Sequence, residues 1–118
     1  MKLNHLNLSV SDTKQAQAFL AKYFGMSISG KPNEHICFLS DDNGMVLSLT
    51  SMALSSESEV RYPATFHVGF IQPTEADVDL MNDRLRADGY EVPEPSREHG
   101  AWTFYFEAPG EFTIEVLC

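Results

Sequence analysis

A carboxylate interrupts an apolar run near the end of the chain. Residues 112–117 read FTIEVL, the composition of a strand that is buried on at least one face, and Glu115 stands inside it. Burying an unpaired carboxylate costs several kcal/mol, so we expect a cationic group to face Glu115. The nature of that cation is the main question that the sequence raises.

Two histidines occupy comparable settings. Residues 3–10 (LNHLNLSV) and 65–71 (TFHVGFI) alternate as strands do, and His5 and His67 fall on the faces opposite their apolar neighbours. Two imidazoles and a carboxylate can take one face of an octahedral ion and leave positions for water and substrate oxygens. His5, His67 and Glu115 are therefore a candidate metal site. The alternative is an ion pair between Glu115 and a histidine in a protein without a metal.

The first half of the chain should form one strand, one helix and three short strands. The helix is predicted to begin at a Ser11 cap and to run to about Phe24, where Gly25 suits its end. The expected strands are 3–10, 26–29, 34–39 and 45–50.

The second half repeats this series after a polar linker, residues 51–63. Thr74 opens the second predicted helix, with Asp77 as its capping partner, and Gly89 ends it. The expected strands are 65–71, 90–92, 102–107 and 112–117, and residues 93–100 are expected to be a loop.

The repeated order predicts an internal duplication within one domain, residues 1–118. The fold class is α+β, with two βαβββ repeats at about 1–51 and 64–118 that form curved, cavity-lining mixed sheets with the helices outside. In this arrangement the polar strand faces would converge and bring His5, His67 and Glu115 to one site.

Composition and charge argue against several classes of protein. The N-terminus lacks the continuous apolar region of a signal peptide and no stretch is long enough for a membrane span, so we expect a cytoplasmic protein without a membrane partner. Cys37 and Cys118 have no CxxC partner and are expected to be free thiols. A formal net charge of −9 repels phosphate backbones, which argues against nucleic-acid binding; it would attract a cationic ligand or simply maintain solubility.

The chain resembles a known superfamily in several segments. The paired βαβββ halves, NHLNLSVSD at the start, FHVGF in the middle and FYFEAPGEFTIEVLC at the end are similar to the vicinal oxygen chelate superfamily. Its members include glyoxalases, fosfomycin-resistance proteins, extradiol dioxygenases and bleomycin-resistance proteins. The resemblance covers nearly the whole chain.

The resemblance implies a divalent ion (Fe, Mn, Ni or Zn) held by His5, His67 and Glu115. A fourth family position falls on Leu49, or on Ser48 if the register slips. Glyoxalases of the family use four protein ligands, whereas thiol transferases of the fosfomycin type and extradiol dioxygenases use two His and one Glu. The implied function is a metalloenzyme of lyase, dioxygenase or thiol-transferase type that acts on a small oxygenated substrate.

Other residues are candidates for substrate contact. Tyr105 could serve as an acid or as a hydrogen-bond donor, and Thr103 shares its strand face. Trp102 could stack on a ligand or pack in the core, and Arg97 could hold an anionic group or lie in a solvated loop. Asn7, two residues after His5, completes the predicted set.

A non-catalytic function is the alternative. Bleomycin-resistance proteins sequester a cationic drug in an acidic, aromatic-lined groove between two subunits, and the charge of −9 and Trp102 favour this reading. The resemblance also implies a homodimer, which would protect exposed strand edges.

Overall fold

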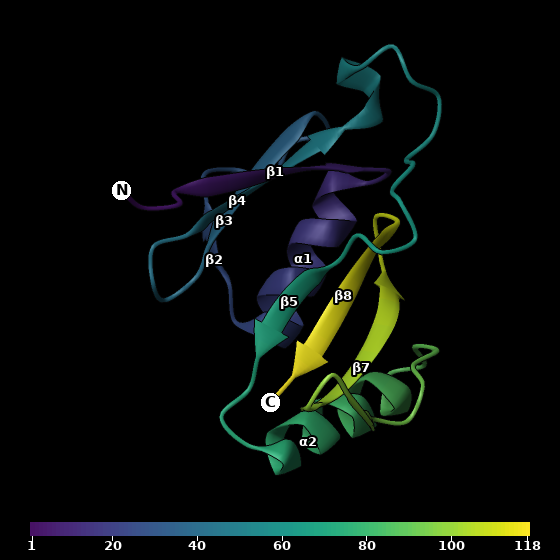
Figure 1. Cartoon of the computed structure of the whole chain (residues 1–118). Coiled ribbons are helices and arrows are strands. Elements are labelled where there is room, and N and C mark those ends of the chain that lie inside the picture. Colours follow the sequence, from purple (N-terminus) through teal and green to yellow (C-terminus); the bar gives the residue numbers. More distant parts are fainter. The chain divides into compact units, whose positions relative to one another are not determined.

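The computed structural model describes all residues from 1 to 118. The chain forms two compact units: Met1–Tyr62 with Ala108–Phe112, and Pro63–Glu107 with Thr113–Cys118. Each unit carries one α-helix and one four-stranded sheet (Figure 1). None of the helices combines the length and the apolar character that crossing a membrane requires.

The first unit contains a mixed sheet with strand order β1-β4-β3-β2. Strand β1 runs parallel to β4, and the other neighbours are antiparallel. Its elements are β1 (His5–Val10), α1 (Thr13–Phe24), β2 (Ser27–Ser29), β3 (Ile36–Ser40), β4 (Val46–Ser51) and a short 3₁₀ turn, η1 (Met52–Leu54).

The second unit repeats this topology with strand order β5-β8-β7-β6. Strand β5 runs parallel to β8, as β1 does to β4. Its elements are β5 (Val68–Ile71), α2 (Glu75–Ala87), β6 (Ser96–Glu98), β7 (Ala101–Ala108) and β8 (Phe112–Leu117). The prediction of two βαβββ repeats is confirmed.

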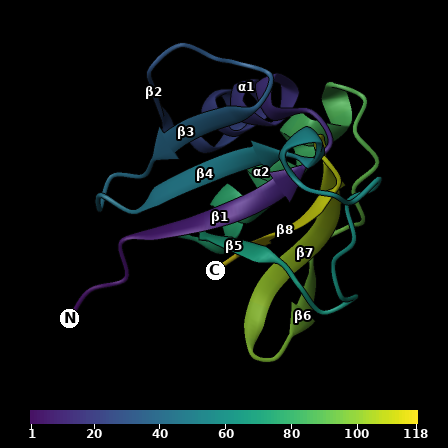
Figure 2. The same ribbon diagram turned by 90° about the horizontal axis from the view of Figure 1, so that it is seen from above.

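Helix α1 covers one face of the first sheet, beside β2, β3 and β4 (Figure 2). Its buried stripe includes Ala16 and Leu20, both 0% exposed, and the sheet contributes Leu8, Leu39 and Leu49, also 0% exposed. The helix ends at Gly25, whose left-handed φ of 64° costs little without a Cβ. The local periodicity thus predicted this layer correctly.

The first helix begins one residue later than the sequence suggested. Asp12, not Ser11, is the N-cap, and its Oδ1 accepts a hydrogen bond of 2.9 Å from the Gln15 amide. The Ser11 amide instead donates to the carbonyl of Gly110, at 3.1 Å. Both side chains suit a cap, so this pairing with the turn Ala108–Phe112 decided between them.

The expected strand at 90–92 is wrong. Val92 is buried, 8% exposed, but the Asn82 side chain donates to the Pro93 carbonyl at 2.7 Å and Arg86 approaches the Val92 carbonyl, so the segment is bonded to α2. The strand of this part of the chain is β6, inside the expected loop, where every residue is exposed and no apolar alternation signals it.

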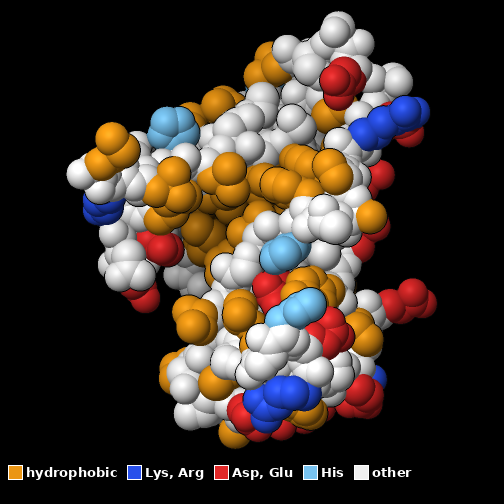
Figure 3. Space-filling view, viewed as in Figure 1, with side chains coloured by type: hydrophobic (Ala, Val, Ile, Leu, Met, Phe, Trp, Pro, Cys, Tyr) orange, Lys and Arg blue, Asp and Glu red, His pale blue; other side chains and the backbone are white.

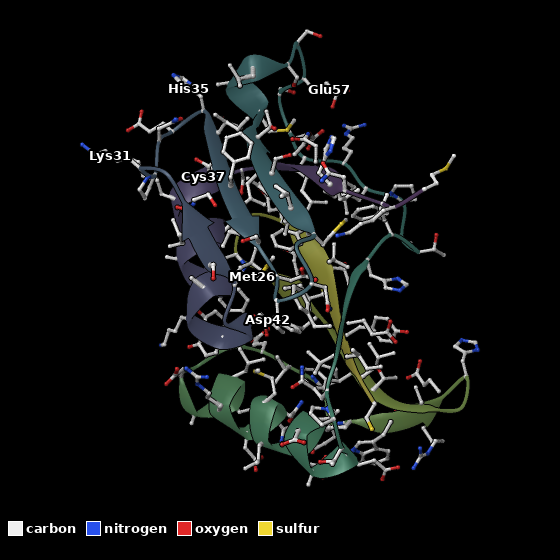
Figure 4. The ribbon with its side chains drawn as sticks, turned by 90° about the vertical axis from the view of Figure 1, so that its left-hand side faces the viewer. Met26, Lys31, His35, Cys37, Asp42 and Glu57 are labelled. Carbon is white, nitrogen blue, oxygen red and sulfur yellow. The ribbon has the colours of Figure 1, made fainter.

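Both cysteines are unpaired, as the sequence predicts. Cys37 is on β3 and 2% exposed, whereas His35 is exposed at the periphery (Figure 4). Both Cys37 and Cys118 are free thiols. On the face drawn in Figure 3 the Lys and Arg side chains are scattered and form no basic patch, which agrees with the net charge of −9.

Candidate functional site

Glu115 lies on the face of β8 that is turned away from the core of its unit. Its neighbours Ile114 and Val116 are 0% exposed, and Glu115 itself is 9% exposed. The alternation of a strand explains this: residues one apart face opposite sides of the sheet, so the two apolar neighbours enter the core while Glu115 does not. The carboxylate is therefore nearly buried by its neighbours on the sheet face.

The strand register decides which residues those neighbours are. Gly69 of β5 is paired with Glu115 in the parallel ladder. On the other side, Trp102 and Cys118 exchange both backbone hydrogen bonds, an antiparallel pair, and continuing that register sets Tyr105 opposite Glu115. The expected strand 65–71 is shorter in the structure, and His67 lies directly before the first residue of β5 with its ring directed to Glu115.

Two hydroxyl groups lie within hydrogen-bond distance of one oxygen of the carboxylate. Tyr105 donates a 2.5 Å hydrogen bond to Glu115 Oε1, and Thr103 Oγ1 lies 3.1 Å from the same oxygen and 2.9 Å from the Val116 carbonyl. Thr103 is 0% exposed. These contacts fix the carboxylate so that Oε2 remains directed to His67.

His67 meets the other carboxylate oxygen. Its Nε2 lies 3.2 Å from Glu115 Oε2, and its Nδ1 lies 3.0 Å from the Thr65 carbonyl. A carbonyl oxygen only accepts, so Nδ1 carries a proton, and in the neutral ring Nε2 would present its lone pair to Oε2. Two lone pairs at this distance repel, so a proton on Nε2 or a metal ion between the two atoms is required.

The tyrosine keeps its proton in this setting. The hydrogen bond to Glu115, together with loss of solvent and the nearby charges of Glu115 and Glu98, raises the pKa of Tyr105 to about 12. Its ring also meets the His67 ring edge-on, with centroids 5.4 Å apart at 86°. Tyr105 is therefore a hydrogen-bond donor throughout the neutral pH range.

The first unit presents a corresponding but different arrangement. His5 is the first residue of β1, and its Nδ1 lies 3.1 Å from Asn4 Oδ1, so that Nε2 has no protein partner. Two residues on, Asn7 Oδ1 accepts hydrogen bonds from Ser48 at 2.8 Å and Thr50 at 2.5 Å. The Asn7 side chain is thus held by two hydroxyls on the open sheet face.

The register identifies Ser48 as the counterpart of Glu115. Asn7 pairs with Ser48 in the parallel ladder, as Gly69 pairs with Glu115. Leu49 pairs with Leu8 and is 0% exposed, so it points into the core of the unit. The register therefore favours Ser48, the alternative that the sequence left open, over Leu49 as the structural counterpart of Glu115.

Trp102 and Arg97 make their contacts with α2. The Trp102 indole donates to Asp79 at 2.8 Å, Arg97 donates to Glu75 at 2.6 Å, and the guanidinium lies 5.5 Å from the centroid of the Trp102 ring. These contacts fasten β6 and β7 to the helix. The two side chains are not among those that surround Glu115, and a substrate role for either stays a prediction.

The donor set of the second unit suits a metal. Nε2 of His67 and Oε2 of Glu115 are directed to one point, and an imidazole and a carboxylate are ordinary ligands of Fe, Mn, Ni and Zn. Neither unit by itself gathers three or more His, Cys, Asp or Glu side chains that could hold an ion. The predicted third ligand, His5, belongs to the first unit.

Some residues around these sites were missed by sequence reasoning. Gly69, Thr50 and the backbone carbonyl of Thr65 contact or adjoin the predicted site residues, and Glu98 acts on Tyr105 through its charge. Only Gly69 could have been found from the sequence. Glycine weakens a strand, so a glycine inside one often marks a place where a ligand or another part of the chain comes close to the backbone.

Comparisons of the sequence and of the structure with known proteins indicate the same family. Residues 2–116 match the Glyoxalase/Bleomycin resistance protein/Dioxygenase superfamily. The chain is 47% identical to a possible glyoxalase from Bacillus cereus, with a TM-score of 0.89, covering 100% of this chain and 99% of that one. A lactoylglutathione lyase from Agrobacterium tumefaciens is similar in fold, at 22% identity and a TM-score of 0.78, with 98% and 92% coverage. No curated protein matches the chain.

Proposed function

Because the chain belongs to the Glyoxalase/Bleomycin resistance protein/Dioxygenase superfamily, we propose that it is a metal-dependent enzyme acting on a small oxygenated substrate. The observation that carries this proposal is the His67–Glu115 pair, whose facing Nε2 and Oε2 atoms lie 3.2 Å apart and need either a proton or a metal ion between them. His5, His67 and Glu115 are the proposed ligands. A divalent ion bound there would polarise the oxygen atoms of a bound substrate.

The chain's own residues orient the site. Tyr105 and Thr103 hold Oε1 of Glu115, which leaves Oε2 for the cation. The Thr65 carbonyl selects the His67 tautomer whose Nε2 is free to bind, the role that hydrogen-bonded partners of metal ligands usually have. Tyr105 keeps its proton and is the proposed donor to a substrate oxygen, with Thr103 beside it.

Asn7 is the proposed substrate contact on the first unit. Its Oδ1 is occupied by the hydroxyls of Ser48 and Thr50, so the amide NH₂ group remains to donate to a substrate oxygen. Because Ser48 stands where the family's fourth ligand would be, a three-residue site is favoured over the four-residue site of glyoxalases. This supports the dioxygenase and thiol-transferase classes, whose sites use two His and one Glu, over a lyase of the glyoxalase type.

A non-catalytic drug-binding protein is the second candidate. The formal net charge of −9 favours a cationic ligand, and the family includes bleomycin-resistance proteins. The Trp102 ring, however, already lies against Arg97 and its indole donates to Asp79. The first candidate therefore stands ahead.

We also propose a homodimer. Each four-stranded sheet, taken by itself, ends in two edge strands, and exposed edges of this kind are commonly covered by another subunit. Light scattering at micromolar protein should give twice the 13.2 kDa chain mass. A monomer mass at all concentrations would contradict the dimer.

Metal content tests the proposed enzyme. Purified protein should contain a divalent ion by elemental analysis, and after chelation its melting temperature should rise on addition of Mn²⁺, Fe²⁺, Ni²⁺ or Zn²⁺, because a ligand that binds only the folded state stabilises it. Protein that holds no metal, and whose melt none of these ions shifts, would exclude the enzyme and leave the drug-binding candidate.

A further inference from the structure

The backbone conformation at position 69 does not require a glycine. Gly69 lies in the middle of β5, is exposed, and does not adopt the left-handed φ that favours glycine. A glycine inside a strand costs stability, because it loses more conformational freedom on folding and packs no side chain. Some other demand must therefore explain its presence next to Glu115.

The space above Gly69 is bounded by two side chains of β8. A Cβ added to Gly69 would lie 3.6 Å from Glu115 Oε2 and 3.6 Å from Leu117 Cδ2, with no other atom within 4 Å. Both are ordinary van der Waals distances. One heavy atom therefore fits in this space without any shift, touching a carboxylate oxygen on one side and an apolar side chain on the other.

Oε2 is the oxygen that a ligand would have to reach. Oε1 is occupied by Tyr105 and approached by Thr103, whereas Oε2 faces only His67. Glu115 pairs with Gly69 in the β5–β8 ladder, so any side chain at that position would project beside Oε2. The missing side chain leaves this approach open.

We propose that Gly69 is a specificity-determining residue that reserves the space beside Glu115 Oε2 for one edge of the ligand. The inference rests on the proposed function for the identity of the site. The two walls define the ligand edge: a hydroxyl or other polar group toward Oε2, carried on a carbon that contacts Leu117. A small organic oxygen compound fits this description.

The test compares Gly69→Ala with Gly69→Val. Both residues favour a strand more than glycine does, so the metal-free melting temperature should rise in both variants. If the space serves a ligand, valine should weaken binding of Mn²⁺ or Zn²⁺ at least tenfold, while alanine, which fills one atom position, should have a smaller effect. Ala101→Val, on the same sheet face but outside the site, is the control and should bind the ions as wild type does.

A second measurement does not depend on metal. Diethyl pyrocarbonate modifies unprotonated imidazoles, and peptide mass spectrometry reports each histidine separately, so His5, His35 and His99 are references within the same sample. In metal-free protein at mildly alkaline pH, Gly69→Val should slow the modification of His67 severalfold relative to those references. If the wild-type protein binds no metal, the proposed function is contradicted. If Gly69→Val still slows the modification of His67 in that case, the proposed role of Gly69 is retained.

Three results would overturn the inference. Gly69→Val could bind Mn²⁺ and Zn²⁺ as tightly as wild type, with His67 modified at the wild-type rate. His67 of the wild type could fail to react while the reference histidines do, which would mean that the space is closed. Both variants could melt below wild type, which would mean that the strand itself requires glycine.

Discussion

His67 Nε2 and Glu115 Oε2 lie 3.2 Å apart, while the opposite ring nitrogen of His67 faces the Thr65 carbonyl at 3.0 Å. The carbonyl fixes which nitrogen carries the proton, so the nitrogen that faces the carboxylate is available for a cation. This relationship explains how a strand of apolar residues tolerates Glu115. It also defines what each substitution below should do.

Glu115→Gln should lower metal affinity by at least about tenfold, since changes to residues that only support metal ligands already cost 10–100-fold. The amide has nearly the shape of the carboxylate but no charge, so the fold should survive. Isothermal titration with Zn²⁺ and Mn²⁺ measures the affinity. Glu107→Gln, an exposed carboxylate on β7, is the matched control and should bind the ions as wild type does. Equal affinity in both variants would remove Glu115 from the ligand set.

Tyr105 should ionise well above the usual pKa of a tyrosine in metal-free protein. Its pKa is raised from 10.0 to about 12, first by the hydrogen bond to Glu115. A raised folded-state pKa favours the protonated form, so the stability it confers is fully present below pH 10 and is lost as pH rises through about 12. Ultraviolet titration of tyrosinate in wild type and Tyr105→Phe should assign the step near pH 12 to this residue. An unchanged titration in the variant would contradict the assignment.

Gly110→Ala should destabilise the protein by about 1–3 kcal/mol. Gly110 has a φ of 104°, and an added Cβ would lie 3.0 Å from Ala16 Cβ and 3.3 Å from Val10 Cβ. Backbone strain and crowding therefore add. Gly89→Ala, at a φ of 90° with nothing within 4 Å, isolates the strain. Urea unfolding should show a larger decrease in the free energy of unfolding for Gly110→Ala than for Gly89→Ala. Equal decreases would mean that the turn can move away from α1 at little cost in free energy.

Asp12→Ala should cost about 1 kcal/mol through loss of the cap on α1. Asp12 Oδ1 accepts from the Gln15 amide, and alanine offers no acceptor. Ser11→Ala is the control, because Ser11 uses its backbone amide rather than its side chain to reach Gly110. Thermal melts of the two variants measure the effect. A larger decrease in melting temperature for Ser11→Ala than for Asp12→Ala would mean that Ser11, as the sequence suggested, is the N-cap.

Much of the fold could be predicted from the sequence because its signals are local. Helix periodicity, the Thr74 cap and the glycine after α1 depend on residues within a few positions of one another, and they predicted both repeats. The face of Glu115 followed from simple alternation. Local signals failed where an exposed polar strand, β6, has no apolar pattern, and where buried Val92 is bonded to a helix instead of a strand.

The sequence by itself determined the two repeated units and the candidate residues His5, His67 and Glu115, whose coordination of a metal stays a prediction. Only the tertiary structure decided that Ser48, not Leu49, corresponds to Glu115, that Tyr105 and Thr103 hold Oε1, and that Trp102 and Arg97 contact α2. The physical reason is register: hydrogen bonding between strands far apart in the chain sets which residues are opposite, and a shift of one residue turns a side chain to the other face of the sheet.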